Sequence, residues 1–444
     1  MRFSSKSSFI TRQVNQISTE GWSALGRKLN KLVLLPLEMP PIFFAFFLVL
    51  LIRLIRPFVI VRIGRLDLGR IAHIMKWDWY LSEKFDGINN GRYLDLFYAT
   101  HSTNHVNRQW LKMWKRTLPL VPGSKLWQNV VRLNGVFPGY QKHEIPETHV
   151  YPDLEKWQAH FSDPFSRGMD IYNKRLNSVL HNKSANIVFT LEEKKKGQKV
   201  LWDIGIPKEK QYICFHARDS AYLDTVYPQR DWNYHNYRDS SIQNYVLAAE
   251  EMVKRGYYAV RMGAIVKDPI HSSNSKVIDY ATNGQRTDFN DIYLGSHCRF
   301  FLCSDGGMSA IPEMFRIPVV YVNWTAILRI STWVLNGLFI FKKFYQKKEN
   351  RHMTFSEIMN FEFDGIDSNE IFARLNLELI ENTPEEIRAV TVEMDERLNG
   401  TWQTTPEDEE LQEQFWALYG PDKVKSPDLR IGAEYLRENQ DLLC

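Results

Sequence analysis

The chain has 444 residues, too many for one typical domain and enough for two or three domains with buried cores. Hydrophobic residues make up 44% of it and charged residues 24%, proportions that exclude a disordered chain and are typical of a globular protein. The formal net charge of +4 is too small to indicate nucleic acid as a partner.

An apolar block near the N-terminus predicts a membrane-associated helix. The block runs from Leu32 to Ile52. Its purest part, Pro40 to Ile52, has 13 residues, whereas a helix that spans a bilayer needs about 20. The preceding residues lack the pattern of a secretory signal. Basic residues flank the block on both sides: Lys28, Lys31, Arg53 and Arg56. We therefore expect residues 1–57 to form a polar N-terminus and a monotopic or peripheral helix in the cytoplasmic leaflet. A single span broken by prolines is the alternative, and a buried core helix is less favoured.

Residues 58–200 alternate between strand-like and helix-like segments and predict a first, Rossmann-like lobe. Phe58 to Ile63 is typical of a buried strand, Arg92 to Tyr98 is a second strand candidate, and Asn107 to Trp114 has a helical pattern. The charged run Glu192 to Lys199 indicates a solvated helix and turn that leads out of this lobe.

Residues 201–400 predict a second Rossmann-like lobe, in which a parallel sheet has helices on both faces. The expected strands are 212–216, 258–262, 300–303 and 319–322, and the expected helices are 242–255, 288–297 and 309–315. Residues 401–444 are expected to close the molecule with helices, including an amphipathic one over 407–418. The predicted fold is α/β, with two Rossmann-like lobes facing a cleft and an N-terminal membrane-associated helix.

The stretch Phe301 to Asn323, FLCSDGGMSAIPEMFRIPVVYVN, has the order strand, glycine turn, helix, strand. We expect Gly306 and Gly307 to make a turn that bulkier residues would resist. Such a turn points backbone N–H groups and the positive end of a helix dipole at one place, which suits a phosphate or diphosphate. The alternative is an ordinary strand–helix turn that binds nothing.

Three expected strand ends carry polar residues: HARD from His216 to Asp219, RMG from Arg261 to Gly263, and SDGG from Ser304 to Gly307. In a parallel sheet these ends meet at one edge, where guanidinium groups bind phosphates bidentately. The expected diphosphate-binding set is His216, Arg218, Arg261, Gly263, Ser304, Asp305, Gly306, Gly307, Met308 and Ser309.

Alternatives remain for the charged residues around this set. Arg218 pairs with Asp219 or Asp224 in the alternative, and Arg261 pairs with Asp288. Asp288 and Asp291 either orient Arg261 or cap the short helix that they begin, and we favour the cap. One helical turn after Ser309, Glu313 either accepts hydrogen bonds from ribose hydroxyls or is a surface carboxylate.

The HARDSAYLD segment is similar to the HxRxTD-type motif of fucosyltransferase-like enzymes, in which the arginine holds the diphosphate of the donor. SDGGMSAIPEMFRIPVVYVNW looks like the donor-binding helix of GT-B glycosyltransferases. Ser220 stands in place of the motif's threonine and the next acid is displaced, so the resemblance does not extend to GDP-fucose as the donor.

Several segments more closely resemble a family of bacterial glycosyltransferases encoded in surface-polysaccharide clusters, such as those for capsule or O-antigen. They lie within about residues 58–360 and are VRIGRLDLGRIAH, NRQWLKMW, CFHARDSAYL, YRDSSIQNY, VRMG, DFNDIYLGSHCRFFLCSDGGMS and LFIFKKFYQKKENRHMTFSEI. The resemblance implies a GT-B fold and a nucleoside-diphosphate sugar donor, with the diphosphate-binding set and Glu313 as the donor site. From the apolar block near the N-terminus we expect a location at the cytoplasmic face of the inner membrane.

A direct displacement at the anomeric carbon needs a general base for the acceptor hydroxyl. Asp67 and His73, in the loop after the first strand, are the candidates, Asp219 is the third, and Arg65 is expected on the acceptor side. In the alternative, Asp67 pairs with Arg65 or Arg70 and His73 is a core histidine. We also expect a second membrane contact over residues 324–345, which are apolar, aromatic and end in basic residues.

No metal or other cofactor is expected. No DxD-type motif stands at a strand end, and arginines can stabilise a leaving diphosphate instead. The four cysteines also lack metal-ligand spacing, and the three that lie in or beside apolar runs are expected to be buried thiols in a reducing compartment: Cys214, Cys298 and Cys303, with Cys444 at the C-terminus.

These observations predict a membrane-associated glycosyltransferase that moves a sugar from a nucleoside diphosphate to a surface-glycan or lipid-linked acceptor. Inversion at the anomeric carbon is expected by analogy. The alternative is a non-catalytic nucleotide- or glycan-binding assembly subunit with the same fold. A dinucleotide-dependent oxidoreductase is disfavoured because no GxGxxG follows any expected strand.

Overall fold

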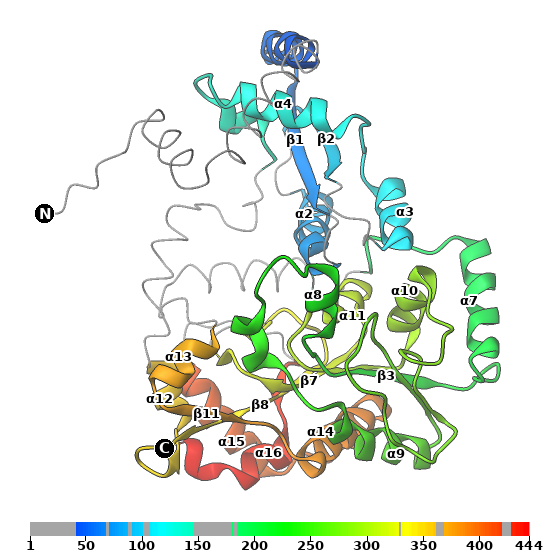
Figure 1. Ribbon diagram of the computed structural model, residues 1–444, viewed down its shortest axis with the longest axis vertical. Helices are drawn as coiled ribbons and strands as arrows, with labels where there is room; N and C mark the ends of the chain where they lie inside the picture. The colour runs from blue at the N-terminus through cyan, green and yellow to red at the C-terminus, as the bar shows by residue number, and fades with distance from the viewer. Residues whose placement is uncertain are drawn as a thin grey trace, which may run out of the picture. The chain divides into compact units, whose positions relative to one another are not determined.

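The computed structural model of this chain forms two compact units (Figure 1). Unit 1 contains Met1–Arg65, Gly91–Ala99 and Leu120–Ile145, and unit 2 contains Leu66–Asn90, Thr100–Pro119 and Pro146–Cys444. The structure describes residues 41–67, 71–87, 91–100, 107–145, 180, 184–327, 330–360, 368–419 and 428–443. The expected N-terminal segment before residue 41 and Cys444 lie outside the described residues.

Unit 1 is built on a helix of residues 41–54 and a two-stranded sheet. The strands are β1 (Ile60–Asp67) and β2 (Tyr93–Thr100), as expected, and each of them ends in unit 2. Helix α4 (Ser124–Asn134) and the 3-10 helix η2 (Tyr140–His143) complete the unit. A small core joins them: Ala45, Val49, Ile52, Val61, Ile63, Tyr98 and Val130.

A buried ion pair holds the two strands of unit 1 together. Arg62 donates to Asp95 through Nε at 2.6 Å and through Nη2 at 3.0 Å. In the described residues of unit 1, β1 and β2 are the only named strands, so a full Rossmann-like first lobe is not seen there. Across the described part of the chain, no helix is long and apolar enough to pass through a membrane.

Unit 2 contains a seven-stranded sheet in the order β12-β8-β7-β6-β3-β4-β5, and all of its paired strands are parallel. The chain runs outward from β3 to β5, returns to β6 on the other side of β3, and runs outward again. This is the strand order of a doubly wound fold, whose ligands bind where the direction reverses. The strands are β3 (Tyr212–His216), β4 (Tyr258–Arg261), β5 (Val277–Ile278), β6 (Phe301–Cys303), β7 (Val319–Trp324), β8 (Gly337–Phe341) and β12 (Arg430–Ile431).

Helices cover both faces of this sheet, with α9 and α14 on one face and α10 and α11 on the other (Figure 1). The helices from the N-terminal side are η1 (Ile71–Ile74), α2 (Met75–Phe85), α3 (Arg108–Thr117), α7 (Leu191–Asp203), α8 (Ala221–Val226), η3 (Asn233–Arg238), η4 (Ile242–Tyr245), α9 (Val246–Lys254), α10 (Asp288–His297), η5 (Gly307–Ser309) and α11 (Ala310–Phe315). Those after β8 are α12 (Phe355–Asn360), α13 (Asn369–Arg374), α14 (Pro384–Asn399), α15 (Pro406–Tyr419), α16 (Ala433–Glu438) and η7 (Gln440–Leu443).

Local sequence signals explain where several of these helices begin. Thr190 and Glu193 form a capping box at the start of α7, and Thr383 and Glu386 form another at α14. Glu193 is buried, and it accepts hydrogen bonds from Arg116 at 2.9 Å. The charged run that was expected to be a solvated linker is therefore part of a helix with one face in the protein.

Residues 66–90 and 100–119, expected in the first lobe, belong to unit 2. Arg316 of α11 donates to Asp78 of α2 at 2.8 Å, and Asn107 donates to the carbonyl of Asp288 at 3.0 Å. Asp78 is 1% exposed. These long-range pairs could not be identified from the local pattern of strands and helices.

Most of the described residues within 324–345, a stretch expected at a membrane, form part of the core instead. Strand β8 lies between β7 and β12, and its central residues Leu338, Phe339 and Ile340 are at most 1% exposed. A strand of a parallel sheet is covered on both faces and therefore reads as a continuous apolar run. After β8 the chain enters a small antiparallel sheet in the order β10-β9-β11, formed by β9 (Lys343–Gln346), β10 (Arg351–His352) and β11 (Leu377–Ile380).

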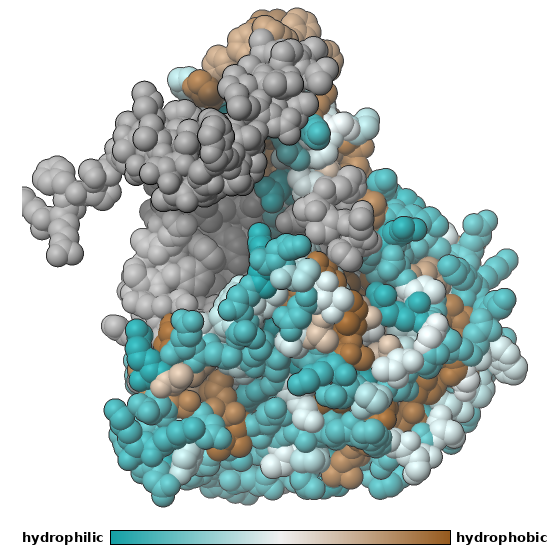
Figure 2. All heavy atoms as spheres, viewed as in Figure 1, coloured by the Kyte–Doolittle hydropathy of each residue, from teal (hydrophilic) through white to brown (hydrophobic). Residues whose placement is uncertain are grey.

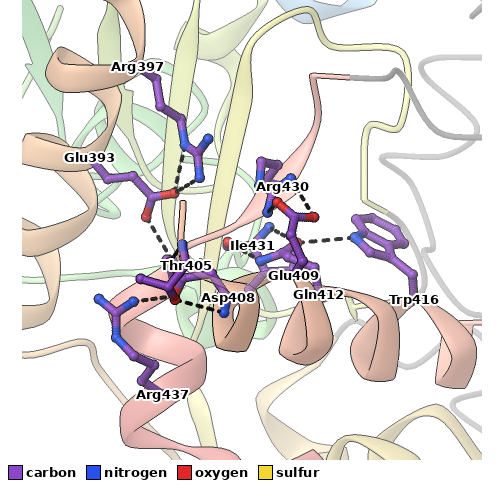
Figure 3. Close-up of polar contacts among 11 residues, drawn as sticks. Glu393, Arg397, Thr405, Asp408, Glu409, Gln412, Trp416, Arg430, Ile431 and Arg437 are labelled. Carbon is purple, nitrogen blue, oxygen red and sulfur yellow. Dashed lines mark hydrogen bonds and ion pairs between the residues drawn. The ribbon is translucent and has the colours of Figure 1, made fainter. Parts of the chain in front are cut away.

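The C-terminal helices are fixed to the sheet by the polar contacts drawn in Figure 3. The side chain of Gln412 in α15 donates to the carbonyl of Ile431 at 2.6 Å and accepts from its N–H at 3.1 Å. Asp408 pairs with Arg437 of α16, and Glu393 of α14 accepts from Arg397 at 2.8 Å. The expected closing helix over 407–418 is α15.

Candidate functional site

The carboxyl ends of β3 and β6 meet at the point where the strand order reverses. His216 is in register with Cys303, and the N–H of Arg218 donates to the Ser304 hydroxyl at 2.8 Å. Ser304 is fully buried. A Cβ built on Gly306 would lie 3.7 Å from the Cβ of Arg218. The HARD and SDGG segments, 86 residues apart at this hydrogen bond, therefore form one site.

Arg218 is a buried cation with an unfilled donor. Its residue is 7% exposed, its Nη1 pairs with Asp239, and its Nη2 has no hydrogen-bond partner among the described residues. Burial lowers the pKa of the guanidinium to about 10, with Arg238 adding to the shift, so the group stays charged near neutral pH. A buried polar group normally has a partner. Nη2 is therefore a buried cationic donor that an anionic ligand oxygen would satisfy.

Two further cations, Arg238 and Lys342, and the carboxylate of Asp239 lie around Arg218. The sequence analysis did not identify these three as site residues. Arg238, at the end of η3, has its Nη1 3.6 Å from Asp305. Lys342, directly after β8, is 4% exposed and donates to the carbonyl of Asp239 at 2.6 Å. Burial lowers the pKa of Lys342 to about 8. Arg238 and Asp239 belong to the YRDSSIQNY segment and Lys342 to the LFIFKKFYQKKENRHMTFSEI segment, and these resemblances were the available signals.

The glycine turn differs from its prediction. Gly306 has a φ of −171°, which any residue adopts, and Gly307 is not among the residues with positive φ. A Cβ on Gly307 would lie 3.9 Å from Ala72, an ordinary contact distance. The protein's own backbone and packing therefore do not require glycine here. Because the two glycines have no side chains, they leave room beside Arg218 for a ligand to approach closely.

The helix after the turn is also shorter than expected. It consists of η5 and the six-residue α11, which ends at Arg316 in the left-handed conformation with a φ of 61°. Pro318 follows two residues later. So short a helix has a small dipole, and the anion-binding capacity of the site lies mainly in its arginines. Within the turn, the Ser309 hydroxyl donates to the carbonyl of Gly306 at 3.0 Å. Met308, also in η5, packs against the core of unit 2.

His216 is held in one tautomer. Its Nδ1 lies 3.0 Å from the carbonyl of Met262, which can only accept, so Nδ1 carries the proton. Burial lowers the pKa of His216, which keeps the imidazole neutral at pH 7. Nε2 therefore has a free lone pair at the carboxyl end of β3 and is an acceptor rather than a cation.

Arg261 has its own counterion. Its side chain is 1% exposed, and its Nη1 lies 3.2 Å from both carboxylate oxygens of Asp279. The partner is therefore Asp279 and not Asp288. Asp288 and Asp291 lie in the first turn of α10 behind the cap residue Thr287, and Asp291 pairs with Arg286 at 2.7 Å.

Asp219 and Gly263 have roles within the protein. Asp219 accepts from the N–H of Ala221 and from the N–H of Lys267, both at 3.0 Å, and so ties two loops together. A Cβ on Gly263 would lie 2.4 Å from Val266, so glycine is required there by packing. Asp219 is also not the partner of Arg218.

Glu313 is not a surface carboxylate. It accepts a hydrogen bond from Tyr321 through Oε1, its Oε2 is buried without a hydrogen-bond partner among the described residues, and burial raises its pKa to about 7. A cavity of about 20 Å³ lies beside it, enough for one water. The cavity is lined by Leu180, Glu313, Arg316, Ile317, Trp333, Val334 and Leu335.

Of the expected base candidates, only His73 belongs to an element that is shown beside the glycine turn. Asp67 ends β1 and His73 belongs to η1, but their side chains lie outside the described residues. Ala72, the neighbour of His73, is the residue that a Cβ on Gly307 would approach. Helix η1 is therefore beside the turn, whereas Arg65 is an exposed residue of unit 1. Among the described residues, no group of three or more His, Cys, Asp or Glu side chains could hold a metal ion.

No family model matches this chain, and no curated protein does. Its fold is similar to a family 9 glycosyl transferase from Veillonella parvula, at 10% identity and a TM-score of 0.33 over 60% of this chain and 80% of that one. It is also similar to the E. coli ADP-heptose heptosyltransferase II, at 10% identity and a TM-score of 0.36 over 71% and 98%.

A third similar structure is a UDP-GlcNAc 2-epimerase from Neisseria meningitidis bound to UDP-GlcNAc, at 11% identity and a TM-score of 0.31 over 77% of this chain and 100% of that one. Likenesses at these TM-scores carry no argument about family or activity. What the structure itself defines is an α/β protein with a doubly wound parallel sheet and a cationic site at its switch point.

Proposed function

We propose that this protein is a glycosyltransferase that moves a sugar from a nucleoside-diphosphate sugar to a surface-glycan or lipid-linked acceptor. The observation that carries the proposal is the unfilled, buried Nη2 of Arg218 beside the Gly306-Gly307 turn. A diphosphate has the charge and the oxygen atoms to fill this donor, and Arg238 adds a second guanidinium close by.

The position of the glycines favours a sugar nucleotide over a dinucleotide. In the dinucleotide fold the glycine fingerprint follows the first strand of the sheet. Here that strand is β3, and His216, Ala217 and Arg218 end it without a glycine. The glycines follow β6, the fourth strand in chain order of this sheet. The likeness of these two segments to GT-B donor sites then supports sugar transfer.

In the proposed reaction the acceptor oxygen bonds to the anomeric carbon as the bond from that carbon to the diphosphate breaks, with inversion. Arg218 and Arg238 stabilise the charge that develops on the leaving diphosphate, so a metal ion is not required. Asp67 and His73 are the proposed bases for the acceptor proton. Asp219 is the weaker candidate because two backbone N–H groups already occupy its oxygens.

Replacement of the Arg218 guanidinium tests the proposal. In Arg218→Ala, loss of a charge-assisted contact should weaken the affinity for UDP, GDP, ADP or CDP, whichever the protein binds, by at least about tenfold. Because the change leaves Asp239 unpaired, the double variant Arg218→Met/Asp239→Asn should show the same loss with folding restored. Calorimetric titration of each nucleotide gives the affinities.

A matched control is Arg351→Ala, which removes an exposed arginine that lies in β10 of the small antiparallel sheet and pairs with Glu357. Its nucleotide affinity should equal that of the unchanged protein. The proposal is wrong if both Arg218 variants bind the nucleotide as the unchanged protein does. Stabilisation by NAD alone among these compounds would also contradict it.

A further inference from the structure

The helix of residues 41–54 exposes a row of large apolar side chains. Its residues Phe43, Phe44, Phe47, Leu50, Leu51 and Leu54 recur at helical spacing on one side, and we call them the apolar stripe. They are between 41% and 75% exposed. Figure 2 shows apolar residues over this helix, which is dark blue in Figure 1.

The opposite side of the same helix is already used inside unit 1. Ala45 and Val49 are fully buried and Ile52 is 6% exposed, all in the core shared with β1, β2 and α4. Among the described residues of unit 1, the stripe is therefore not part of the core. A helix that is apolar all round needs a second apolar surrounding besides the protein core.

The charges of unit 1 identify that surrounding. Among its described residues the acidic ones are Asp95, which is buried in its pair with Arg62, and Glu144. Its exposed charged residues are all basic: Arg65, Arg92, Lys125, Arg132 and Lys142. An apolar stripe on a unit whose exposed charged residues are basic matches a bilayer that presents acyl chains beneath anionic headgroups.

We propose that the apolar stripe inserts into the surface of an anionic phospholipid bilayer, with the helix lying along it. The helix of 14 residues is about 21 Å long, shorter than the roughly 30 Å hydrocarbon core. It therefore lies in the interface and does not span. This inference does not depend on the proposed function, because it concerns unit 1 alone.

Vesicle sedimentation tests it with the full chain and two triple variants. The stripe variant is Phe43→Gln/Phe47→Gln/Leu54→Gln, which replaces side chains that are 65%, 60% and 75% exposed. The control variant is Val188→Gln/Leu191→Gln/Trp202→Gln in unit 2, where the exposures are 68%, 77% and 70%. The vesicles are phosphatidylcholine alone or with about 30% phosphatidylglycerol.

The unchanged protein and the control variant should bind the vesicles with phosphatidylglycerol more tightly than the neutral ones, and added salt should weaken that binding. The stripe variant should bind both at least about tenfold more weakly. Equal binding by all three proteins, an equal loss in both variants, or no binding by the unchanged protein would overturn the proposal. If sedimentation velocity instead shows that the stripe holds two copies together and vesicles do not bind, a second copy is the occupant and the proposal is wrong.

Discussion

Two apolar stretches of this chain look alike in sequence and have opposite surroundings in the structure. Residues 41–54 and strand β8 are both rich in Phe, Leu and Ile, and both were expected at a membrane. In the helix, Phe47 is 60% exposed, whereas Phe339 in β8 is fully buried. The comparison teaches that composition identifies a stretch that must avoid water, while its partners decide what covers it.

The largest expected effect is on the stability of unit 2. Phe339→Ala should lower the free energy of unfolding by about 3–5 kcal/mol, because it leaves a cavity between β7 and β12. Phe47→Ala in the helix should change it by less than about 0.5 kcal/mol, because the side chain is exposed. Urea unfolding of both variants measures the difference. Similar values for the two would mean that the helix face is also buried in the protein.

A smaller effect is the pH dependence of stability that comes from the carboxylate of Glu313. Burial raises the pKa of Glu313 from 4.5 to about 7. A carboxyl group whose pKa is higher in the folded state binds more protons there than in the unfolded chain, so stability falls as the pH rises from about 4.5 to about 7 and is level above that. The fall is on the order of 3 kcal/mol.

Glu313→Gln keeps the shape of this side chain and removes its titration. The variant should lose this part of the pH dependence, which urea unfolding at pH 5 and at pH 8 would measure. As a control, Glu357→Gln changes an exposed carboxylate whose pKa the Arg351 pair lowers to about 2, so its removal leaves the dependence between pH 5 and 8 in place. If the free energy of unfolding changes equally between pH 5 and pH 8 in the unchanged protein and in Glu313→Gln, the raised pKa is not that of Glu313.

The smallest effect concerns space rather than charge. Gly306→Ala should leave the free energy of unfolding within about 1 kcal/mol, because φ and packing both admit a Cβ. We expect its nucleotide affinity to fall about tenfold, because the methyl group occupies room beside Arg218. Gly263→Ala is the contrasting case, since its Cβ would lie 2.4 Å from Val266, and it should lower stability itself. Unchanged nucleotide affinity in Gly306→Ala would mean that the turn is not part of the nucleotide site.

The order of strands and helices in unit 2 was largely predictable from local patterns. The expected strands at 212–216, 258–262 and 300–303 are β3, β4 and β6, and the helix at 288–297 is α10. Hydrophobic runs and glycine stops determine these elements locally. The burial of Cys214, Cys298 and Cys303 was also predicted and is confirmed.

What the sequence did not reveal depends on pairs far apart in the chain. The partner of Arg218 is Asp239 and that of Arg261 is Asp279, neither of which stands at the strand ends that were compared. Lys342 enters the site only because β8 ends close to η3. The convergence of HARD and SDGG was predicted because parallel strands bring their carboxyl ends together, which needs no knowledge of side-chain partners.

Strand β12, the two residues Arg430 and Ile431, has a consequence for how the chain is made. It pairs with β8 at the edge of the sheet, although helices α12 to α15 lie between the two strands in the chain. During synthesis, one side of the β8 backbone therefore stays unpaired until the chain has been made beyond residue 431. A product that stops before residue 430 would present an apolar strand edge to its neighbours, a template for aggregation and a mark for proteolysis.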